Sequence, residues 1–158
     1  MHPGMTRLAP LLLTLLAFAL ASCGGDDAPS REEFAERASE ICRDTEQALE
    51  NVGENAESPE DIADAVDQVI EESRNAVDEL ADLERPEGDA GETAETFVNA
   101  TRTEIEEKGI PALEDLRDAL AEGDQQAAQE AAQELQSIDS DASNKAAKDL
   151  GADECAEG

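Results

Sequence analysis

Apolar residues recur at every third or fourth position over most of the chain beyond residue 30, which is the spacing of one face of an α-helix. The pattern divides into four amphipathic segments, each with its own start and stop signals. We predict helices from about Ser30 to Gly53, Ser58 to Pro86, Thr93 to Ala121 and Gln125 to Leu150. No useful length of the alternation typical of β-strands appears, so the sequence predicts an all-α fold.

Several residues favour helix ends at these places. Ser30 followed by Glu33 is the pattern of a capping box, and Pro59 suits a first helical position because its missing N–H is not needed there. Gly123 suits the end of the third helix and Asp124 the N-cap of the fourth, so this turn is very short. A short turn makes the two helices antiparallel neighbours.

The third segment is interrupted by Gly109-Ile110-Pro111. Proline removes one hydrogen bond of the helix and clashes with the carbonyl four residues back, so we predict a kink near Lys108 without a chain reversal. Four helices with short connections then predict one up-down-up-down four-helix bundle over residues 30–158.

The inward positions of these helices form a thin apolar core that includes several small or hydroxyl side chains. The predicted inward residues are Phe34, Ala38, Ile41, Cys42, Thr45, Ala48, Leu49, Ile62, Val66, Val69, Ile70, Ser73, Val77, Leu80, Phe97, Thr101, Ile105, Leu113, Leu116, Leu120, Ala128, Ala131, Leu135, Ile138, Ala142, Ala146 and Leu150.

The N-terminus has the features of an export signal. Arg7 precedes an uncharged stretch from Leu8 to Ala21, which is shorter than the about 20 apolar residues that a membrane-spanning helix needs. Residues 20–23, Leu-Ala-Ser-Cys, resemble the lipobox of bacterial lipoproteins at all four positions. An ordinary secretory signal with a chance cysteine at its end is the alternative.

The lipobox resemblance implies a location. Residues 1–22 are then a lipoprotein signal peptide that is cleaved off after Ser22, and the sulfur of Cys23 carries diacylglycerol. Residues 23–29 form a lipidated tether, and residues 30–158 form an acidic helical domain outside the cell membrane. The predicted partner is therefore the membrane itself, through the lipid on Cys23.

The mature chain is strongly acidic. The sequence has 41 acidic and 11 basic residues, and the signal peptide contains only Arg7 among them, which leaves 10 basic and 41 acidic residues and a net charge of −31. This charge argues against nucleic acid or anionic lipid as a partner. A negative charge of this size usually reflects no more than a solvated surface. Adaptation to high salt would give the same acidic composition.

The mature chain also lacks His, Trp and Tyr, because the one histidine is His2 in the signal peptide. This excludes Ser-His-Asp and Cys-His nucleophiles and histidine-ligated zinc or haem. Phe34 and Phe97 are the aromatic residues that remain, which is little for an aromatic-lined pocket or a base-stacking platform. We predict no enzyme activity, no catalytic residue and no cofactor.

Cys42 and Cys155 are the two cysteines beyond the lipobox, and an exported domain favours their oxidation to one disulfide. In an antiparallel bundle the end of the fourth helix lies beside the start of the first. The tail after Gly151 would then fold back along the first helix to reach Cys42. The alternative is a buried thiol at Cys42 and a free thiol at Cys155.

The spacing F-x-x-x-A-x-x-I-C from Phe34 to Cys42, together with L-G-x-x-x-C from Leu150 to Cys155, resembles a set of small secreted or lipid-anchored helical proteins from high-GC Gram-positive bacteria. The resemblance supports the helical fold and the disulfide. It implies no activity.

Two acidic patterns could concern cations. Residues 139–143, Asp-Ser-Asp-Ala-Ser, resemble the opening of an EF-hand loop, but Asn144 and Leu150 stand where the loop needs Gly and a bidentate Glu, so we predict no metal site. Acidic pairs one turn apart also follow the second helix, and they could hold hydrated divalent cations diffusely, although plain solvation is the better explanation. These pairs are Glu60/Asp64, Asp67/Glu71 and Asp78/Asp82.

Together these features predict a membrane-anchored lipoprotein of the cell envelope whose bundle is a non-catalytic interaction or structural module with an unknown protein partner. The alternative is a module that binds divalent cations or a basic partner through its acidic faces.

Overall fold

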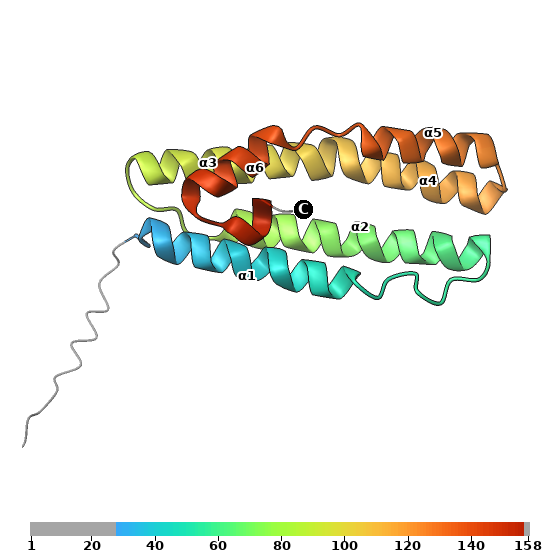
Figure 1. The fold of residues 1–158 in the computed structure, drawn as a ribbon, viewed down its shortest axis with the longest axis horizontal. Helices are drawn as coiled ribbons and strands as arrows, with labels where there is room; N and C mark the ends of the chain where they lie inside the picture. Colours follow the sequence, from blue (N-terminus) through green and yellow to red (C-terminus); the bar gives the residue numbers. More distant parts are fainter. Residues whose placement is uncertain (1–27, 157–158) are drawn as a thin grey trace, which may run out of the picture.

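The computed structural model describes residues 28–156, and this part of the chain is all-α, with no strand (Figure 1). The predicted signal peptide, the lipidation site Cys23 and most of the tether 23–29 lie outside the described residues. The elements are α1 (Arg31–Leu49), α2 (Pro59–Asp82), α3 (Asp89–Arg102), the π-helix η1 (Thr103–Gly109), α4 (Ile110–Glu122), α5 (Gln125–Gln136), α6 (Asp141–Leu150) and the 3₁₀-helix η2 (Asp153–Ala156).

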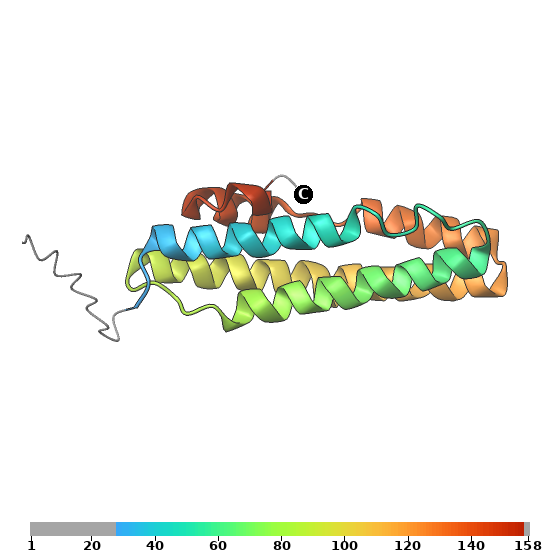
Figure 2. The same ribbon diagram turned by 90° about the horizontal axis from the view of Figure 1, so that it is seen from below.

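These elements form an elongated bundle of four helical segments that run in alternating directions (Figures 1 and 2). The first two segments are α1 and α2. The third is the continuous run of α3, η1 and α4, and the fourth consists of α5 and α6. Figure 1 shows that α1 stops well short of the end of the bundle where α2 begins and α4 ends. That end is therefore built from α2, α4 and α5.

The starts of α1 and α2 agree with the sequence. Glu33 donates its backbone N–H to the Ser30 hydroxyl at 3.2 Å, and its carboxylate accepts the Ser30 N–H at 2.8 Å, which completes the predicted capping box. A second capping box joins Ser58 and Asp61, with Pro59 in the first turn. In both helices the N–H of the N-cap residue and the N–H three residues later are thus satisfied by side chains.

The third segment begins at Asp89, four residues earlier than the predicted Thr93, behind an N-cap Gly88 that has a φ of 65°. The predicted continuity through Pro111 is confirmed, since η1 leads directly into α4. Within η1 the Ile110 N–H bonds the Ile105 carbonyl, five residues back. This wider turn lies just before Pro111, where an α-helical carbonyl would clash with the proline ring.

The prediction of one helix from Gln125 to Leu150 is wrong, because residues 137–140 separate α5 from α6. The Ser137 hydroxyl donates to the Glu134 carbonyl at 2.8 Å, and the Asp139 carboxylate accepts the Asp141 N–H at 2.9 Å. These side chains take up backbone groups that a continuous helix would pair with each other. The apolar stripe continues across the break, which is why periodicity alone suggested one helix.

The core consists of two apolar clusters. One surrounds Phe34, Phe97 and Leu150, where α1, α3, α6 and η2 meet. The other surrounds Ile70 and Ile110, between α2, η1 and α4. Most predicted inward residues are buried or half-buried. The exceptions are Ala48, Ile62 and Ala142, which are exposed. Ile62 is 41% exposed because α1 does not extend to the first turn of α2.

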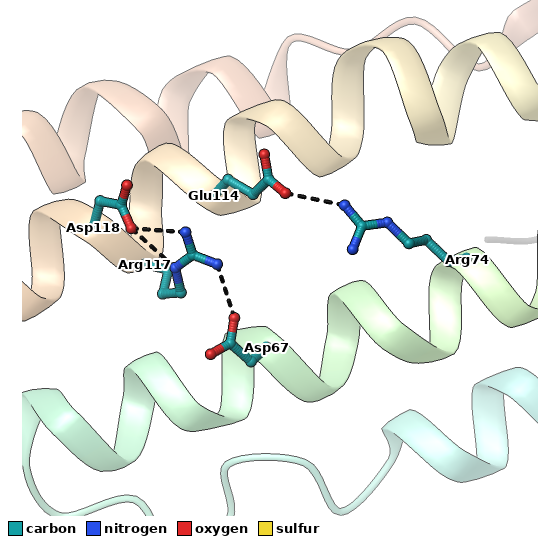
Figure 3. A network of polar contacts seen from close by, with 5 residues as sticks. All are labelled: Asp67, Arg74, Glu114, Arg117 and Asp118. Carbon is teal, nitrogen blue, oxygen red and sulfur yellow. Dashed lines mark hydrogen bonds and ion pairs between the residues drawn. The ribbon is translucent and has the colours of Figure 1, made fainter.

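Ion pairs join α2 to α4 along their exposed side (Figure 3). Arg117 donates to Asp67 at 3.0 Å and to the neighbouring Asp118 at 2.8 Å, and Arg74 donates to Glu114 at 3.0 Å. The hydrogen bond to Asp67, followed by that to Asp118, raises the pKa of Arg117 above its ordinary value. Two of the few basic residues therefore link helices that are otherwise rich in carboxylates.

Candidate functional site

A groove of about 620 Å³ opens between the two apolar clusters, where α1, α2, α3, η1, α6 and η2 come together. We call it the central groove. Its apolar lining is formed by Leu49, Ala76, Leu80, Phe97 and Ile105. Phe97 and Leu80 belong to the larger cluster, so the floor of the groove is continuous with the core of the bundle.

The central groove exists because short side chains occupy the inward positions around it. Cys42 and Thr45 on α1, Thr101 on α3 and Ser143 on α6 all line it. These side chains are too small to meet across the bundle, whereas Phe and Leu fill the space at Phe34 and Leu150 nearby. A hollow therefore remains between these helices.

Carboxylates stand around the groove. Glu46 and Glu50 come from α1, Glu104 from η1 and Glu154 from η2, and no basic residue lines the groove. Glu104 is half-buried and accepts a hydrogen bond from the buried hydroxyl of Ser143 on α6. The four carboxylates give this part of the surface a negative potential that no neighbouring lysine or arginine of the lining offsets.

Thr101 has a buried hydroxyl without a hydrogen-bond partner, and it lines the groove. A threonine in a helix usually donates to the carbonyl four residues back. Thr45, Thr93 and Thr96 do so at 2.8–2.9 Å. An unpaired buried hydroxyl costs about 1–3 kcal/mol, so an exception of this kind needs a reason.

The predicted Cys42–Cys155 disulfide is confirmed, and it forms part of the groove wall. The two Cα atoms are 5.3 Å apart, although the residues are separated by 113 positions in the sequence. The tail after Gly151 folds back against α1 as predicted, with Ala152 and Ala156 buried in the larger cluster. The disulfide thus fixes η2, and with it Glu154, beside the C-terminal half of α1.

None of the acidic residues in the patterns that suggested cations lines the central groove. Asp141 begins α6 and Asp139 bonds its backbone, so residues 139–143 form a helix start and not an EF-hand loop. Asp67 on α2 pairs with Arg117. Within residues 28–156 no group of three or more side chains is arranged to hold a metal ion.

The four carboxylates of the groove were not predicted as a set. The sequence carries one signal for the groove itself, because Thr45 and Thr101 interrupt the apolar stripes of the first and third helices. Which acidic residues lie beside those positions depends on the register between helices, and on the fold-back of η2. Periodicity within one helix does not contain that information.

Comparison of the chain with protein-family models, curated proteins and solved structures gave no match. No helix between residues 28 and 156 is both long enough and apolar enough to cross a membrane. The function must therefore be inferred from the residues of this chain and their arrangement.

Proposed function

We propose that the protein is a lipoprotein anchored through Cys23 at the extracytoplasmic face of the cell membrane, and that its bundle is a non-catalytic interaction module. The observation that carries the anchor is the four-residue match of positions 20–23 to a lipobox, behind a short apolar stretch with a basic start. The first helix begins at Arg31, eight residues after Cys23 in the sequence, so the anchor would hold the bundle close to the bilayer.

The central groove supports the interaction role. It combines an apolar floor with a charged rim, which is the general composition of binding sites in proteins. Its potentially reactive groups are carboxylates, hydroxyls, an amide and the disulfide of Cys42 and Cys155, with no imidazole or free thiol among the lining residues. This set suits binding better than nucleophilic catalysis.

A second candidate function is binding of divalent cations or a basic partner through the acidic helix faces. The small number of ion pairs favours this function. Eight carboxylates pair with a basic side chain within residues 28–156, whereas the whole sequence has 41 acidic residues. Titration with calcium or magnesium chloride at constant ionic strength tests it. Saturable binding supports this function, and a response equal to that of sodium chloride contradicts it.

The anchor is tested by expressing the full chain with Cys23→Ala and separating membranes from soluble fractions. We expect this variant to be released or to remain as an unprocessed precursor, because the sulfur that accepts the lipid is gone. A chain with both Cys42→Ala and Cys155→Ala is the matched control and should stay membrane-bound. A Cys23→Ala protein that is cleaved after Ser22 and still fractionates with membranes would disprove the proposed anchor.

A further inference from the structure

We propose that the central groove binds a small organic cation with an apolar body, of the alkylammonium class. The proposal rests on the proposed role of the bundle as a binding module, and it does not depend on the lipid at Cys23. It concerns one ligand chemistry at one place, whereas the acidic faces of the helices would attract any cation over the whole surface.

The size and construction of the groove suit a small molecule. Its volume of about 620 Å³ lies within the range of roughly 300–1,000 Å³ typical of small-molecule sites. Its walls come from helices, and the Cys42–Cys155 disulfide fixes η2 against α1. The site is therefore formed before any ligand arrives, which reduces the entropy that binding would cost.

The apolar floor accounts for the body of the ligand. Phe97 and Leu80 are almost fully buried beneath the groove, and Leu49 and Ile105 extend its apolar lining along α1 and η1. A ligand that was only charged would leave the half-buried Leu49 and Ile105 in contact with water. An alkyl chain covers them, and each added methylene should strengthen binding until the floor is filled.

The charges select the sign of the head group. Glu46, Glu50, Glu104 and Glu154 surround the groove without a basic residue in the lining, so an ammonium group gains attraction and a carboxylate meets repulsion. Glu104 is the most enclosed of the four, since it is half-buried and the other three are exposed. Its attraction to a bound ammonium is therefore the least screened by solvent.

Thr101 gives an independent indication of a ligand. Its hydroxyl has no hydrogen-bond partner in the structure, while the threonines nearby in α1 and α3 donate theirs to carbonyls within the helix. A polar ligand beside Thr101 could provide the missing partner after a rotation about χ1. Stability and binding should then respond in opposite directions when the hydroxyl is removed.

The probe is n-hexylammonium, titrated calorimetrically into the mature lipidated protein in nonionic detergent at 0.15 M NaCl. 1-Hexanol and hexanoate are the matched neutral and anionic probes, with the same alkyl chain. We expect one saturable site for hexylammonium, weaker binding of hexanol and no binding of hexanoate. Equal affinity for hexanol would overturn the role of charge, and the absence of a saturable site would overturn the proposal.

Variants locate the site. Glu104→Gln and Glu46→Gln should each weaken hexylammonium binding by roughly three- to tenfold, the loss expected for one partly exposed charge partner. Glu60→Gln, which makes the same charge change outside the groove, should leave the affinity unchanged. Because detergent is common to all variants, partition of the probe into micelles cancels in the comparison. Equal losses in all three variants would show attraction by net charge alone and would contradict the proposal.

Thr101→Val keeps the shape of the side chain and removes the hydroxyl. We expect a higher melting temperature and weaker hexylammonium binding. A threonine with only a structural role would not change stability and affinity in opposite directions. Unchanged affinity together with a higher melting temperature would overturn the ligand-binding role of Thr101. The separate Cys23→Ala fractionation reports on the anchor alone, so failure of cation binding and failure of the anchor are distinguishable.

Discussion

Cys42 and Cys155 lie 113 residues apart in the sequence, and their bond ties the end of the chain to the middle of α1. Crosslinking a loop of this length removes entropy from the unfolded chain, and the double change Cys42→Ala and Cys155→Ala should lower the free energy of unfolding by up to about 4.7 kcal/mol. Thermal melts followed by far-UV circular dichroism measure this, since the sequence has no Trp or Tyr for fluorescence. A reductant should destabilise the wild-type protein and leave the double variant unaffected. Equal melting temperatures for the two proteins would contradict the prediction.

The capping boxes make part of the stability depend on pH. Hydrogen bonds from Ser30, first its backbone N–H, lower the pKa of Glu33, and the hydroxyl and then the N–H of Ser58 lower the pKa of Asp61. A carboxyl with a lowered pKa in the folded state contributes stability above its ordinary pKa and loses it as the pH falls through the lowered value. The usual values are 4.5 and 3.8, so this contribution is present at pH 7 and disappears in acid below them.

The test compares the wild type with a chain carrying Glu33→Gln and Asp61→Asn. We expect the variant to melt at a lower temperature at pH 7 and the difference to close in acid. The control carries Glu36→Gln and Asp64→Asn, which remove the same charges from exposed positions on α1 and α2 that are not part of the capping boxes. A control that loses as much stability as the capping variant would show that the caps contribute nothing specific.

Gly91 allows the turn between α2 and α3 to close. A Cβ atom at this position would lie 2.2 Å from the Pro86 carbonyl oxygen, which is closer than atoms can pack. Gly91→Ala should therefore destabilise the fold by about 1–3 kcal/mol, the cost of overpacking, despite the better helix propensity of alanine. Gly109→Ala is the control, because a Cβ there would lie 3.4 Å from the Glu104 carbonyl oxygen. Urea unfolding measures both, and equal effects at the two positions would contradict the prediction.

The net charge of the sequence, −30 at pH 7, predicts that salt stabilises the folded protein. At 0.01 M salt the Debye length is about 30 Å, and at 1 M it is about 3 Å, so distant carboxylates cease to repel one another. If salt removes about 1 kcal/mol of this repulsion from the folded state, the melting temperature of a domain of this size should rise by about 4 °C. A melting temperature that stays constant from 0.01 M to 1 M NaCl would contradict the prediction.

Several features that the sequence predicted correctly are local ones. Ser30 with Glu33, and Pro59 after Ser58, marked the starts of α1 and α2 because a cap depends on residues within one turn. The disulfide was predictable as well, since the two cysteines beyond Cys23 allow one intramolecular pairing. The up-down order of the segments followed from short connections such as the turn at Gly123.

The features that the sequence did not predict depend on side chains that compete for backbone hydrogen bonds, or on contacts between residues far apart in the sequence. At Ser137 and Asp139 the side chains compete with the helix for its backbone groups, and the apolar stripe hides this competition. At Ile62 the burial of an inward residue depends on how far α1 extends, which its own sequence neighbours do not determine. The central groove depends on the register of α1, η1 and η2, so its carboxylates could not be grouped from the sequence.

The unbroken course of α3, η1 and α4 gives the bundle a considerable length. These elements contain 14, 7 and 13 residues, and at about 1.5 Å per residue they extend for roughly 50 Å. Figure 1 shows the start of α1 at one end of this length and the turn between α4 and α5 at the other. If Cys23 carries the proposed lipid and the bundle stands upright on its tether, the tip at Gly123 lies tens of ångströms above the bilayer. The central groove would then lie at an intermediate height, above the lipid headgroups and reachable from the side.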